Sequence, residues 1–183
     1  MARLELYIPV GRQKLRCGYT TGTCAAAAAA GAAARLLTGE TLPAVRIITP
    51  AGVAVEAELL RHAAGEGWAA CAVRKDGGDD PDVTDGTLVY ARVETTASPG
   101  IVIGGGEGVG RVTKPGLDQP VGAAAINSIP RRMITAQLTQ AMEQHGYTGG
   151  LSAVISIPAG VELAKKTFNP RLGIMGGISI LGT

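Results

Sequence analysis

The sequence has few aromatic residues: four tyrosines, one tryptophan and one phenylalanine among 183 residues. Single-stranded nucleic acids are bound largely by stacking their bases on aromatic side chains, so this class of partner is poorly supported. The net charge does not support a nucleic-acid partner either, because 17 basic and 15 acidic residues leave a formal net charge of only +2. A nucleic-acid-binding surface needs a clustered basic excess. We therefore expect no nucleic-acid partner, and a core built from Ala, Val, Ile and Leu.

Histidine and cysteine are also scarce. His62 and His145 are too few for a histidine-based metal site, so we expect no bound metal. The three cysteines, Cys17, Cys24 and Cys71, cannot all pair and show no Cys-x-x-Cys spacing. This usage is typical of a reduced cytoplasmic protein. The serines lie in no nucleophile-elbow pattern, so hydrolytic triad chemistry is not supported.

Long hydrophobic runs are missing as well. Residues 1–5 contain no apolar signal core. The most apolar stretch, residues 24–37, is too short and too rich in alanine to span a bilayer. We therefore predict a soluble cytoplasmic protein with no membrane partner, of a length that suits one domain or one and a half.

An alanine-rich segment predicts the first long helix. It runs from about Thr23 to Leu37, with threonines placed to cap its start and Gly39 placed to end it. A helix with hardly any bulky side chain allows a neighbouring backbone or a ligand to approach closely. Its first amides and its dipole favour an anion, which makes three residues candidates for cofactor binding: Thr21, Gly22 and Thr23. Ordinary capping is the alternative interpretation.

Alternating and β-branched residues predict strands at 45–49, 53–60, 68–74, 88–96, 101–103, 151–157 and 172–175. A second amphipathic helix begins at residues 127–130, where Asn127 or Ser128 is placed to cap it, and ends near His145. A short helix is expected at 159–166. The order of elements predicts an α+β fold, with mixed α/β as an alternative, in which a β-sheet is packed by the two long helices.

The glycine-rich run Gly104–Gly110 follows a predicted strand, where a phosphate-binding loop would lie. It fits neither the dinucleotide-binding nor the P-loop spacing. Its backbone amides can still line an anionic ligand, and a plain glycine-rich turn is the alternative. The candidate cofactor-binding residues here are Gly104, Gly105 and Gly106.

Two charged segments stand out. Residues 75–86 carry five carboxylates but lack the glutamate and the spacing of an EF-hand, so a solvated turn is as well supported as a binding loop. If Asp79 or Asp80 faces a pocket, either can orient a cationic or hydroxylated ligand. Arg131 and Arg132 lie in the first turn of the second long helix, where cations oppose the dipole unless an anion recruits them. A solvated face is the alternative for this pair.

Several unusual stretches, taken together and in order, resemble the cobalt-precorrin-5B C1-methyltransferase family of anaerobic cobalamin biosynthesis. They cover nearly the whole chain and lie at residues 15–25 (LRCGYTTGTCA), 75–86, 104–117, 127–134 and 157–183.

The resemblance implies methyl transfer from S-adenosylmethionine to carbon 1 of cobalt-precorrin-5B, giving cobalt-precorrin-6A. In such a reaction Asp79 and Asp80 are our candidate catalytic residues, because a carboxylate can hold the sulfonium or help to deprotonate. The corrinoid substrate carries many carboxylates, so the candidate substrate-binding residues are cationic: Arg111, Lys114, Arg131 and Arg132.

Members of this family are longer than this chain. We therefore expect residues 1–170 to form an N-terminal α+β domain and residues 171–183 to begin a Rossmann-like second domain that is not present. Self-association into a homo-oligomer is left open. The competing interpretations are a non-catalytic corrinoid-binding or dimerisation module, and a transferase that binds a phosphate ligand through Gly104–Gly110.

Overall fold

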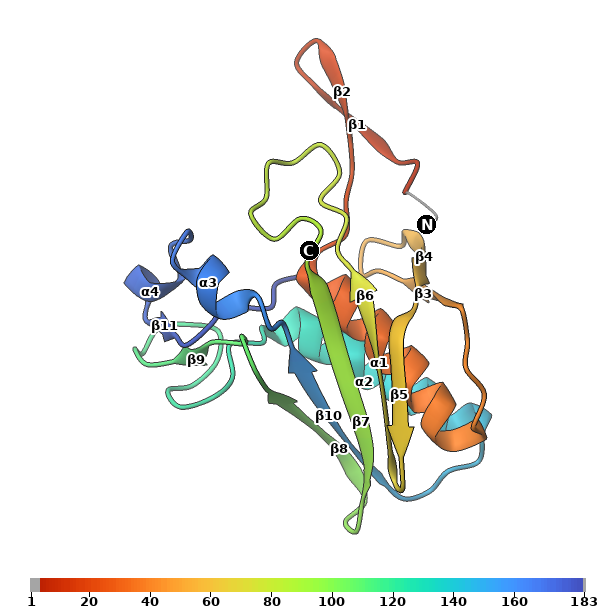
Figure 1. Cartoon of the computed structure of the whole chain (residues 1–183). Coiled ribbons are helices and arrows are strands. Elements are labelled where there is room, and N and C mark those ends of the chain that lie inside the picture. Colours follow the sequence, from red (N-terminus) through yellow and green to blue (C-terminus); the bar gives the residue numbers. More distant parts are fainter. Residues whose placement is uncertain (1–3, 183) are drawn as a thin grey trace.

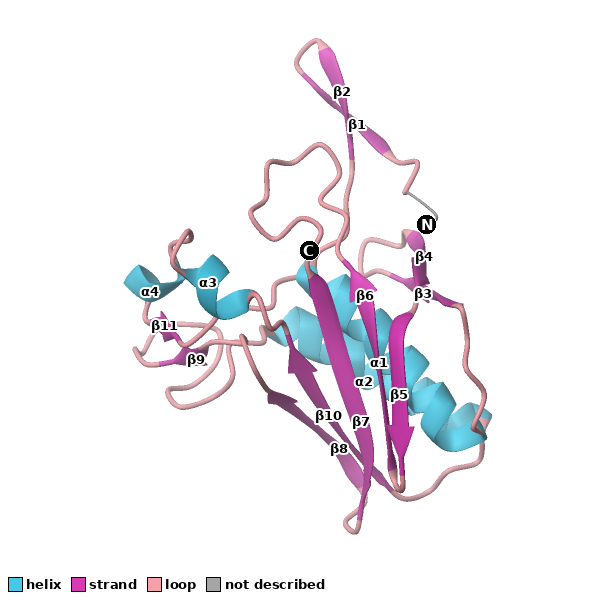
Figure 2. Ribbon diagram, in the orientation of Figure 1, coloured by secondary structure: helices cyan, strands magenta, loops and turns pink. Residues whose placement is uncertain are grey.

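The computed structural model describes residues 4–182. Residues 1–3, part of the segment without an apolar signal core, and Thr183, part of the expected entry to a second domain, lie outside that range. A sheet lies against two long helices, α1 (Thr21–Thr38) and α2 (Ser128–Gln144), and the smaller elements gather beyond one end of the sheet (Figures 1 and 2). The predicted α+β fold is therefore confirmed. No helix within 4–182 combines the length and hydrophobicity needed to cross a bilayer.

The central sheet has five strands in the order β5-β6-β7-β10-β8. Their bounds are β5 (Leu60–Gly65), β6 (Trp68–Arg74), β7 (Leu88–Thr96), β8 (Gly100–Gly105) and β10 (Gly150–Ser156). Strand β10 pairs antiparallel with β7 and parallel with β8. Because two parallel neighbours cannot be joined by a tight turn, the chain must cross over between them, and helix α2 lies in that connection.

Helix α1 is buried along most of its length because its side chains are small. Seven alanines between Ala25 and Ala33 have no exposed surface. The Thr20 hydroxyl caps the start by accepting the Thr23 amide at 3.1 Å, and Gly39, at φ 79°, ends the helix as predicted. With mostly methyl groups on its buried surface, α1 packs against β6 and β7 of the sheet and against α2.

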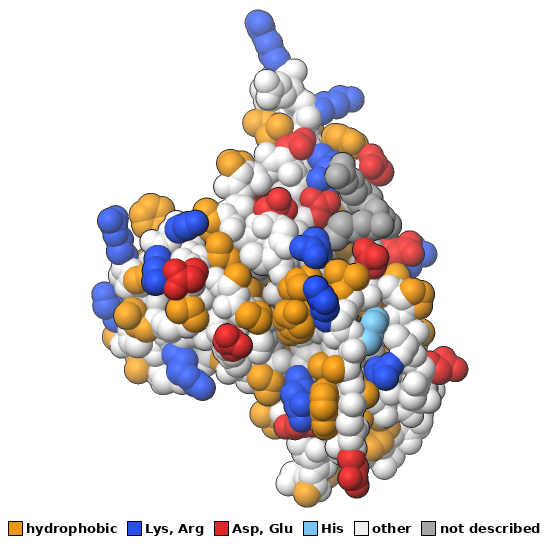
Figure 3. Space-filling view, viewed as in Figure 1, with side chains coloured by type: hydrophobic (Ala, Val, Ile, Leu, Met, Phe, Trp, Pro, Cys, Tyr) orange, Lys and Arg blue, Asp and Glu red, His pale blue; other side chains and the backbone are white. Residues whose placement is uncertain are grey.

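The other face of the sheet points away from the helices. Figure 3 shows this face as a mixture of hydrophobic and charged side chains. One of its contacts is a cation–π interaction, in which the Arg92 guanidinium lies 3.8 Å from the centroid of the Trp68 ring. The guanidinium of an arginine thus covers part of the single tryptophan.

The remaining elements are short. They are the hairpin of β1 (Tyr7–Val10) and β2 (Gln13–Arg16), the hairpin of β3 (Ala44–Ile48) and β4 (Ala54–Glu58), the pair β9 (Arg111–Val112) and β11 (Ile174–Met175), and the helices α3 (Gly160–Ala164) and α4 (Asn169–Leu172).

Two predicted strands differ from the structure. The strand expected at 53–60 is divided, because Ala54–Glu58 pairs with β3 whereas β5, from Leu60, pairs with β6. Arg61, at φ 54°, lies where the register of β5 shifts. The strand expected at 172–175 is confined to Ile174–Met175, since Asn169–Leu172 forms α4 and Gly173, at φ 89°, ends that helix.

Residues 174–181 return to the core of the same domain. Ile178 and Ile180 are 2% and 0% exposed, and they form bridges with Val109 and Ile126. The Leu181 carbonyl accepts the Gly22 amide at 2.7 Å. This stretch is therefore an integral part of the described domain, and a Rossmann-like domain that begins at 171–183 stays a prediction.

Neighbouring glycines in β8 allow a test of packing. A Cβ on Gly105 would lie 2.7 Å from the Ala124 Cβ, whereas a Cβ on Gly104 would approach nothing closer than 3.9 Å. We predict that Gly105→Ala lowers the free energy of unfolding by about 2 kcal/mol through overpacking, and that Gly104→Ala does not lower it. Thermal melts of both variants check this, with a Tm loss of roughly 4–8 °C for Gly105→Ala alone. Equal melting temperatures would show that the packing is looser than described.

Candidate functional site

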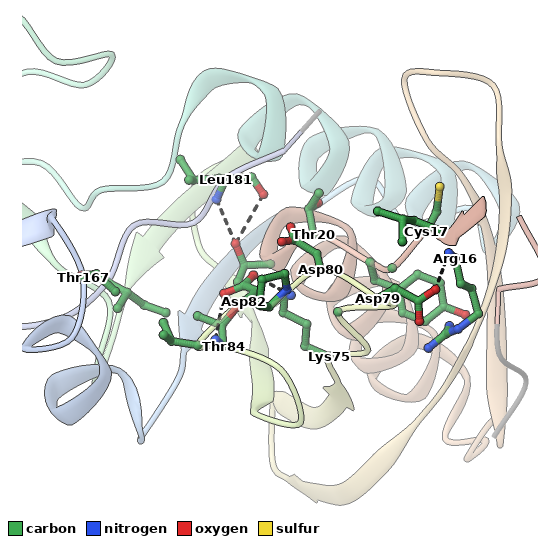
Figure 4. Close-up of a pocket in the computed structure, with 18 of the residues that line it drawn as sticks. Arg16, Cys17, Thr20, Lys75, Asp79, Asp80, Asp82, Thr84, Thr167 and Leu181 are labelled. Carbon is green, nitrogen blue, oxygen red and sulfur yellow. Dashed lines mark hydrogen bonds and ion pairs between the residues drawn. The ribbon is translucent and has the colours of Figure 1, made fainter. Parts of the chain in front are cut away.

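A pocket of about 790 Å³ lies where three segments far apart in the sequence meet (Figure 4). Its lining comes mainly from residues 15–21, which lead into α1, from residues 75–84 of the acidic segment, and from residues 167–181 near the end of the chain. Cavities of this size are typical of sites for small organic ligands.

A paired arginine joins the first two segments. The Arg16 guanidinium donates two hydrogen bonds to the Asp76 carboxylate, at 2.7 and 2.8 Å, and this interaction raises the pKa of Arg16 above its ordinary value. The Arg16 amide also donates to the Asp79 carboxylate at 2.7 Å, and the Asp79 amide returns a bond to the Arg16 carbonyl. Bidentate pairs are geometrically specific, so the acidic segment is held in place against the chain that enters α1.

Most carboxylates of the acidic segment bond to the chain itself. Asp76, Asp82 and Asp85 each accept a backbone amide of the same segment, from Gly78, Thr84 and Gly77 respectively. This is the hydrogen bonding of a structured turn. Nowhere between residues 4 and 182 do three or more His, Cys, Asp or Glu side chains gather in a way that could hold a metal ion.

The two candidate catalytic residues, Asp79 and Asp80, both line the pocket. Asp79 is held by the Arg16 amide. Asp80 is exposed, and its carboxylate makes no hydrogen bond or ion pair with the described part of the chain. Asp80 is therefore the carboxylate with the greatest freedom to meet a ligand.

Sequence reasoning missed a buried ion pair in the same pocket. Lys75 is only 4% exposed, and its Nζ lies 2.8 Å from Oδ2 of Asp82. Burial by itself would raise the pKa of Asp82, but hydrogen bonds from Lys75 and from the Thr84 amide outweigh it, and the pKa lies below its ordinary value. The available signal was a lysine directly after a strand of mostly buried residues, where a charge is rarely left without a partner.

The start of α1 contributes less to the pocket than predicted. Thr21 lines it, but Gly22 and Thr23 do not. Their amides are already bonded, to the Leu181 carbonyl and to the Thr20 hydroxyl respectively. The C-terminal stretch therefore occupies part of the expected anion position.

Cys24 follows in the same turn of α1. Burial raises the pKa of its thiol to about 12. This residue is thus a packing cysteine, which agrees with its 1% exposure.

Gly104, Gly105 and Gly106 lie outside the pocket. Two of them are explained by close packing: a side chain on Gly105 would meet Ala124 and Val109, and one on Gly106 would meet Ser156 and Val154. Their role in cofactor binding stays a prediction.

Arg131 already has hydrogen-bond acceptors within the fold. Its guanidinium donates to the carbonyls of Ile126, Ile103 and Ala124, at 2.9, 3.1 and 3.5 Å. Burial lowers the pKa of Arg131 from its ordinary value. These bonds tie the end of β8 to the segment before α2, and a role of Arg131 in substrate binding stays a prediction.

The anion at the start of α2 comes from the chain. The Asp118 carboxylate accepts the Ser128 amide at 2.6 Å. The prediction that Asn127 or Ser128 caps this helix through its own side chain is therefore wrong, because a carboxylate from a distant loop does so instead. The pKa of Asp118 lies below its ordinary value, mainly because the Gln119 side chain donates a hydrogen bond to this carboxylate. Arg132 is exposed and lies near enough to contribute to the same shift.

The other two candidate cations are exposed and lie outside the pocket. Arg111 donates to the Gly122 carbonyl at 3.1 Å, and Lys114 donates to the Arg171 carbonyl at 3.3 Å. The structure thus brings Thr21, Asp79 and Asp80 together and keeps all four candidate substrate-binding cations apart from them.

The depressed pKa of Asp82 predicts a pH dependence of stability. A group whose pKa is lower in the folded state stabilises the fold above its unfolded pKa, and the contribution is lost as the pH falls through the folded value. We predict that Asp82→Asn lowers the free energy of unfolding by about 1 kcal/mol at neutral pH, and that the difference from the unmodified chain shrinks below the ordinary Asp value of 3.8. Thermal melts between neutral and acidic pH measure it.

The matched control is Glu162→Gln. Glu162 pairs with Lys165 at the surface, where both side chains are largely exposed, and such pairs contribute little. Its effect should be small at every pH. A difference between Asp82→Asn and the unmodified chain that is constant across the pH range would contradict the assignment.

A family model, two curated relatives and a solved structure similar to this chain lead to one family. The CbiD family model matches residues 8–183. A cobalt-precorrin-5B C(1)-methyltransferase of Geobacillus kaustophilus (strain HTA426) is 54% identical over 172 residues, which is 94% of this chain and 46% of the relative. One of Ruminiclostridium cellulolyticum is 51% identical and covers 98% of this chain and 47% of its own length.

A solved structure agrees with these relatives. The crystal structure of a cobalamin biosynthesis protein (cbiD) from Archaeoglobus fulgidus is 40% identical, has a TM-score of 0.72, and covers 99% of this chain and 57% of that chain. The chain spans about half the length of the curated relatives it matches. Sequence and fold lead to the same conclusion: this chain belongs to the CbiD family.

Proposed function

We propose that this chain supplies the N-terminal α+β domain of an S-adenosylmethionine-dependent methyltransferase. The reaction adds a methyl group to carbon 1 of cobalt-precorrin-5B, giving cobalt-precorrin-6A, in anaerobic cobalamin biosynthesis. The observation that carries the proposal is the identity of about half of all aligned residues, across nearly the whole chain, with proteins named for this activity. Because those relatives are about twice as long, a second domain that completes the enzyme is part of the proposal.

The charge of the pocket favours the methyl donor over the corrinoid as its ligand. Three carboxylates line it, from Asp79, Asp80 and Asp82. Two cations oppose them, and one of these, Arg16, is already paired with Asp76. S-adenosylmethionine is a net cation, because its sulfonium and its ammonium outweigh one carboxylate. A corrinoid with many carboxylates would be repelled here.

The transfer itself needs position more than acid or base catalysis. The departing sulfide is neutral and requires no proton, so aligning the sulfonium methyl with the nucleophilic carbon supplies most of the rate. In our proposal Asp80 stabilises the cationic donor in the pocket. Asp79, which is fixed by the Arg16 amide, adds to the negative electrostatic potential there. The corrinoid carboxylates are held from outside the pocket by the exposed cations Arg111, Lys114 and Arg132.

Methyl transfer tests the proposal directly. Protein incubated with cobalt-precorrin-5B and S-adenosylmethionine carrying a labelled methyl group should yield a corrinoid that has gained one labelled methyl, detected by mass spectrometry. Calorimetry should show donor binding. If the donor neither binds nor transfers its methyl group, the proposal fails.

Asp80→Asn tests the carboxylate at the pocket. Removing one negative charge should weaken S-adenosylmethionine binding about five-fold, which corresponds to about 1 kcal/mol. Titration calorimetry measures the change. Glu162→Gln removes an exposed carboxylate outside the pocket and should leave the affinity unchanged. Equal affinities for both variants would exclude Asp80 from donor binding.

Substitutions of the adjacent residues Arg131 and Arg132 should have different effects, one on stability and the other on the KM for the corrinoid. Arg132→Ala should raise the KM for the corrinoid several-fold and leave Tm unchanged, because Arg132 is exposed. Arg131→Ala leaves up to three backbone carbonyls without their donor, and should lower the free energy of unfolding by about 2 kcal/mol. Steady-state kinetics and thermal melts distinguish the two. An unchanged KM for Arg132→Ala would show that this side chain is merely solvated.

A further inference from the structure

Two buried polar groups in the pocket, the Lys75 ammonium and the Thr84 hydroxyl, make fewer hydrogen bonds than they can. The Lys75 ammonium has three N–H donors, and its only partner in the described chain is Oδ2 of Asp82, at 2.8 Å. Thr84 is 7% exposed, and its hydroxyl makes no hydrogen bond, although it lies close enough to Asp82 to influence that carboxyl. Buried polar groups are nearly always satisfied in folded proteins. Both residues therefore have donors available for a ligand.

The chain fixes both residues before any ligand arrives. The Lys75 amide donates to the Thr87 carbonyl and the Gly86 amide donates back to the Lys75 carbonyl. The Thr84 carbonyl accepts the Thr87 hydroxyl at 2.6 Å. Asp82 bridges the two residues, since one of its oxygens contacts the Lys75 ammonium and the other accepts the Thr84 amide. Figure 4 shows Lys75, Asp82 and Thr84 next to one another in the pocket.

The available groups specify an acceptor with one negative charge. An ammonium and a hydroxyl that both donate suit the two oxygens of a carboxylate. The start of α1, which reaches the pocket at Thr20 and Thr21 and has no acidic residue in its first turn, adds positive potential. A polyanion such as a nucleotide phosphate would meet the carboxylates of Asp79, Asp80 and Asp82 as well. A single carboxylate on a ligand that is otherwise cationic avoids this repulsion.

We propose that Lys75 and Thr84 bind the α-carboxylate of the methionyl part of the methyl donor. The inference rests on the proposed function and deepens it, because it divides one pocket into two parts. Lys75 and Thr84 receive the carboxylate, and Asp80 receives the cationic ammonium and sulfonium. The pocket thereby distinguishes S-adenosylmethionine from adenosine derivatives without a carboxylate.

The test compares two methyl donors that differ only in the carboxylate. Titration calorimetry measures binding of S-adenosylmethionine and of decarboxylated S-adenosylmethionine to the full chain. We expect Thr84→Val to weaken S-adenosylmethionine binding five- to ten-fold and to change the affinity for the decarboxylated donor by less than two-fold. Thr84→Ser, which keeps the hydroxyl, should restore the affinity of the unmodified chain. Lys75→Met should weaken S-adenosylmethionine binding more than Thr84→Val does.

Thr84→Val also keeps the test independent of folding. Because the Thr84 hydroxyl has no partner, its removal should not lower Tm, whereas Lys75→Met leaves Asp82 unpaired. Thr135→Val, on the exposed face of α2 and outside the pocket, is the matched control and should leave both affinities unchanged.

The outcomes separate the two proposals. If both donors bind but Thr84→Val weakens neither, or weakens both equally, the carboxylate assignment is overturned and the proposed function stands. If the unmodified chain binds neither donor at millimolar concentration, the carboxylate assignment and the donor-binding part of the proposed function are both overturned.

Discussion

The packing of helix α1 is the constraint on which the rest of the fold depends. Its small alanine side chains allow strands β6 and β7 on one side and helix α2 on another to pack close to its backbone. Such a helix contributes little hydrophobic area per residue, so the larger aliphatic side chains must come from its neighbours. Ile134 and Leu138 of α2 and Leu151 and Ile155 of β10 supply them, and all four are fully buried. A chain with six aromatic residues thus obtains its core by close packing of small and branched side chains.

The same helix determines where the pocket lies. Residues 15–21 must lead into its first turn, and the Arg16–Asp76 pair aligns the acidic segment beside them. Residues 174–181 reach the same end from the opposite direction, where Leu181 bonds to Thr21 and Gly22. The pocket is the space left between these three segments. Its polar groups therefore stand on positions that the backbone fixes, as a selective binding site requires.

Local patterns made α1, β6, β7, β10 and α2 predictable, because periodicity and capping residues lie within each element. The family was also recognisable from the sequence, since long stretches match in order. Side-chain partners were not predictable. The dipole argument that makes Arg131 a candidate for binding an anion uses only local sequence, whereas the carbonyls to which Arg131 donates come from β8 and the loop before α2. The position of Lys75 directly after a strand indicates burial, but the sequence does not show that Asp82 is its partner.

The bonds between Thr21 and Leu181 join residues 160 positions apart. A nascent chain emerges from the ribosome in order, so the first turn of α1 is synthesised long before its partner. Until residues 174–181 follow, the start of the helix lacks Leu181, and the core lacks Ile178 and Ile180. Contacts of such long sequence separation slow folding. Strands β6 and β7 and helix α2, which cover the rest of α1, are synthesised earlier, so only the first turn of the helix waits for residues 174–181, and its amides are exposed to other chains during that interval.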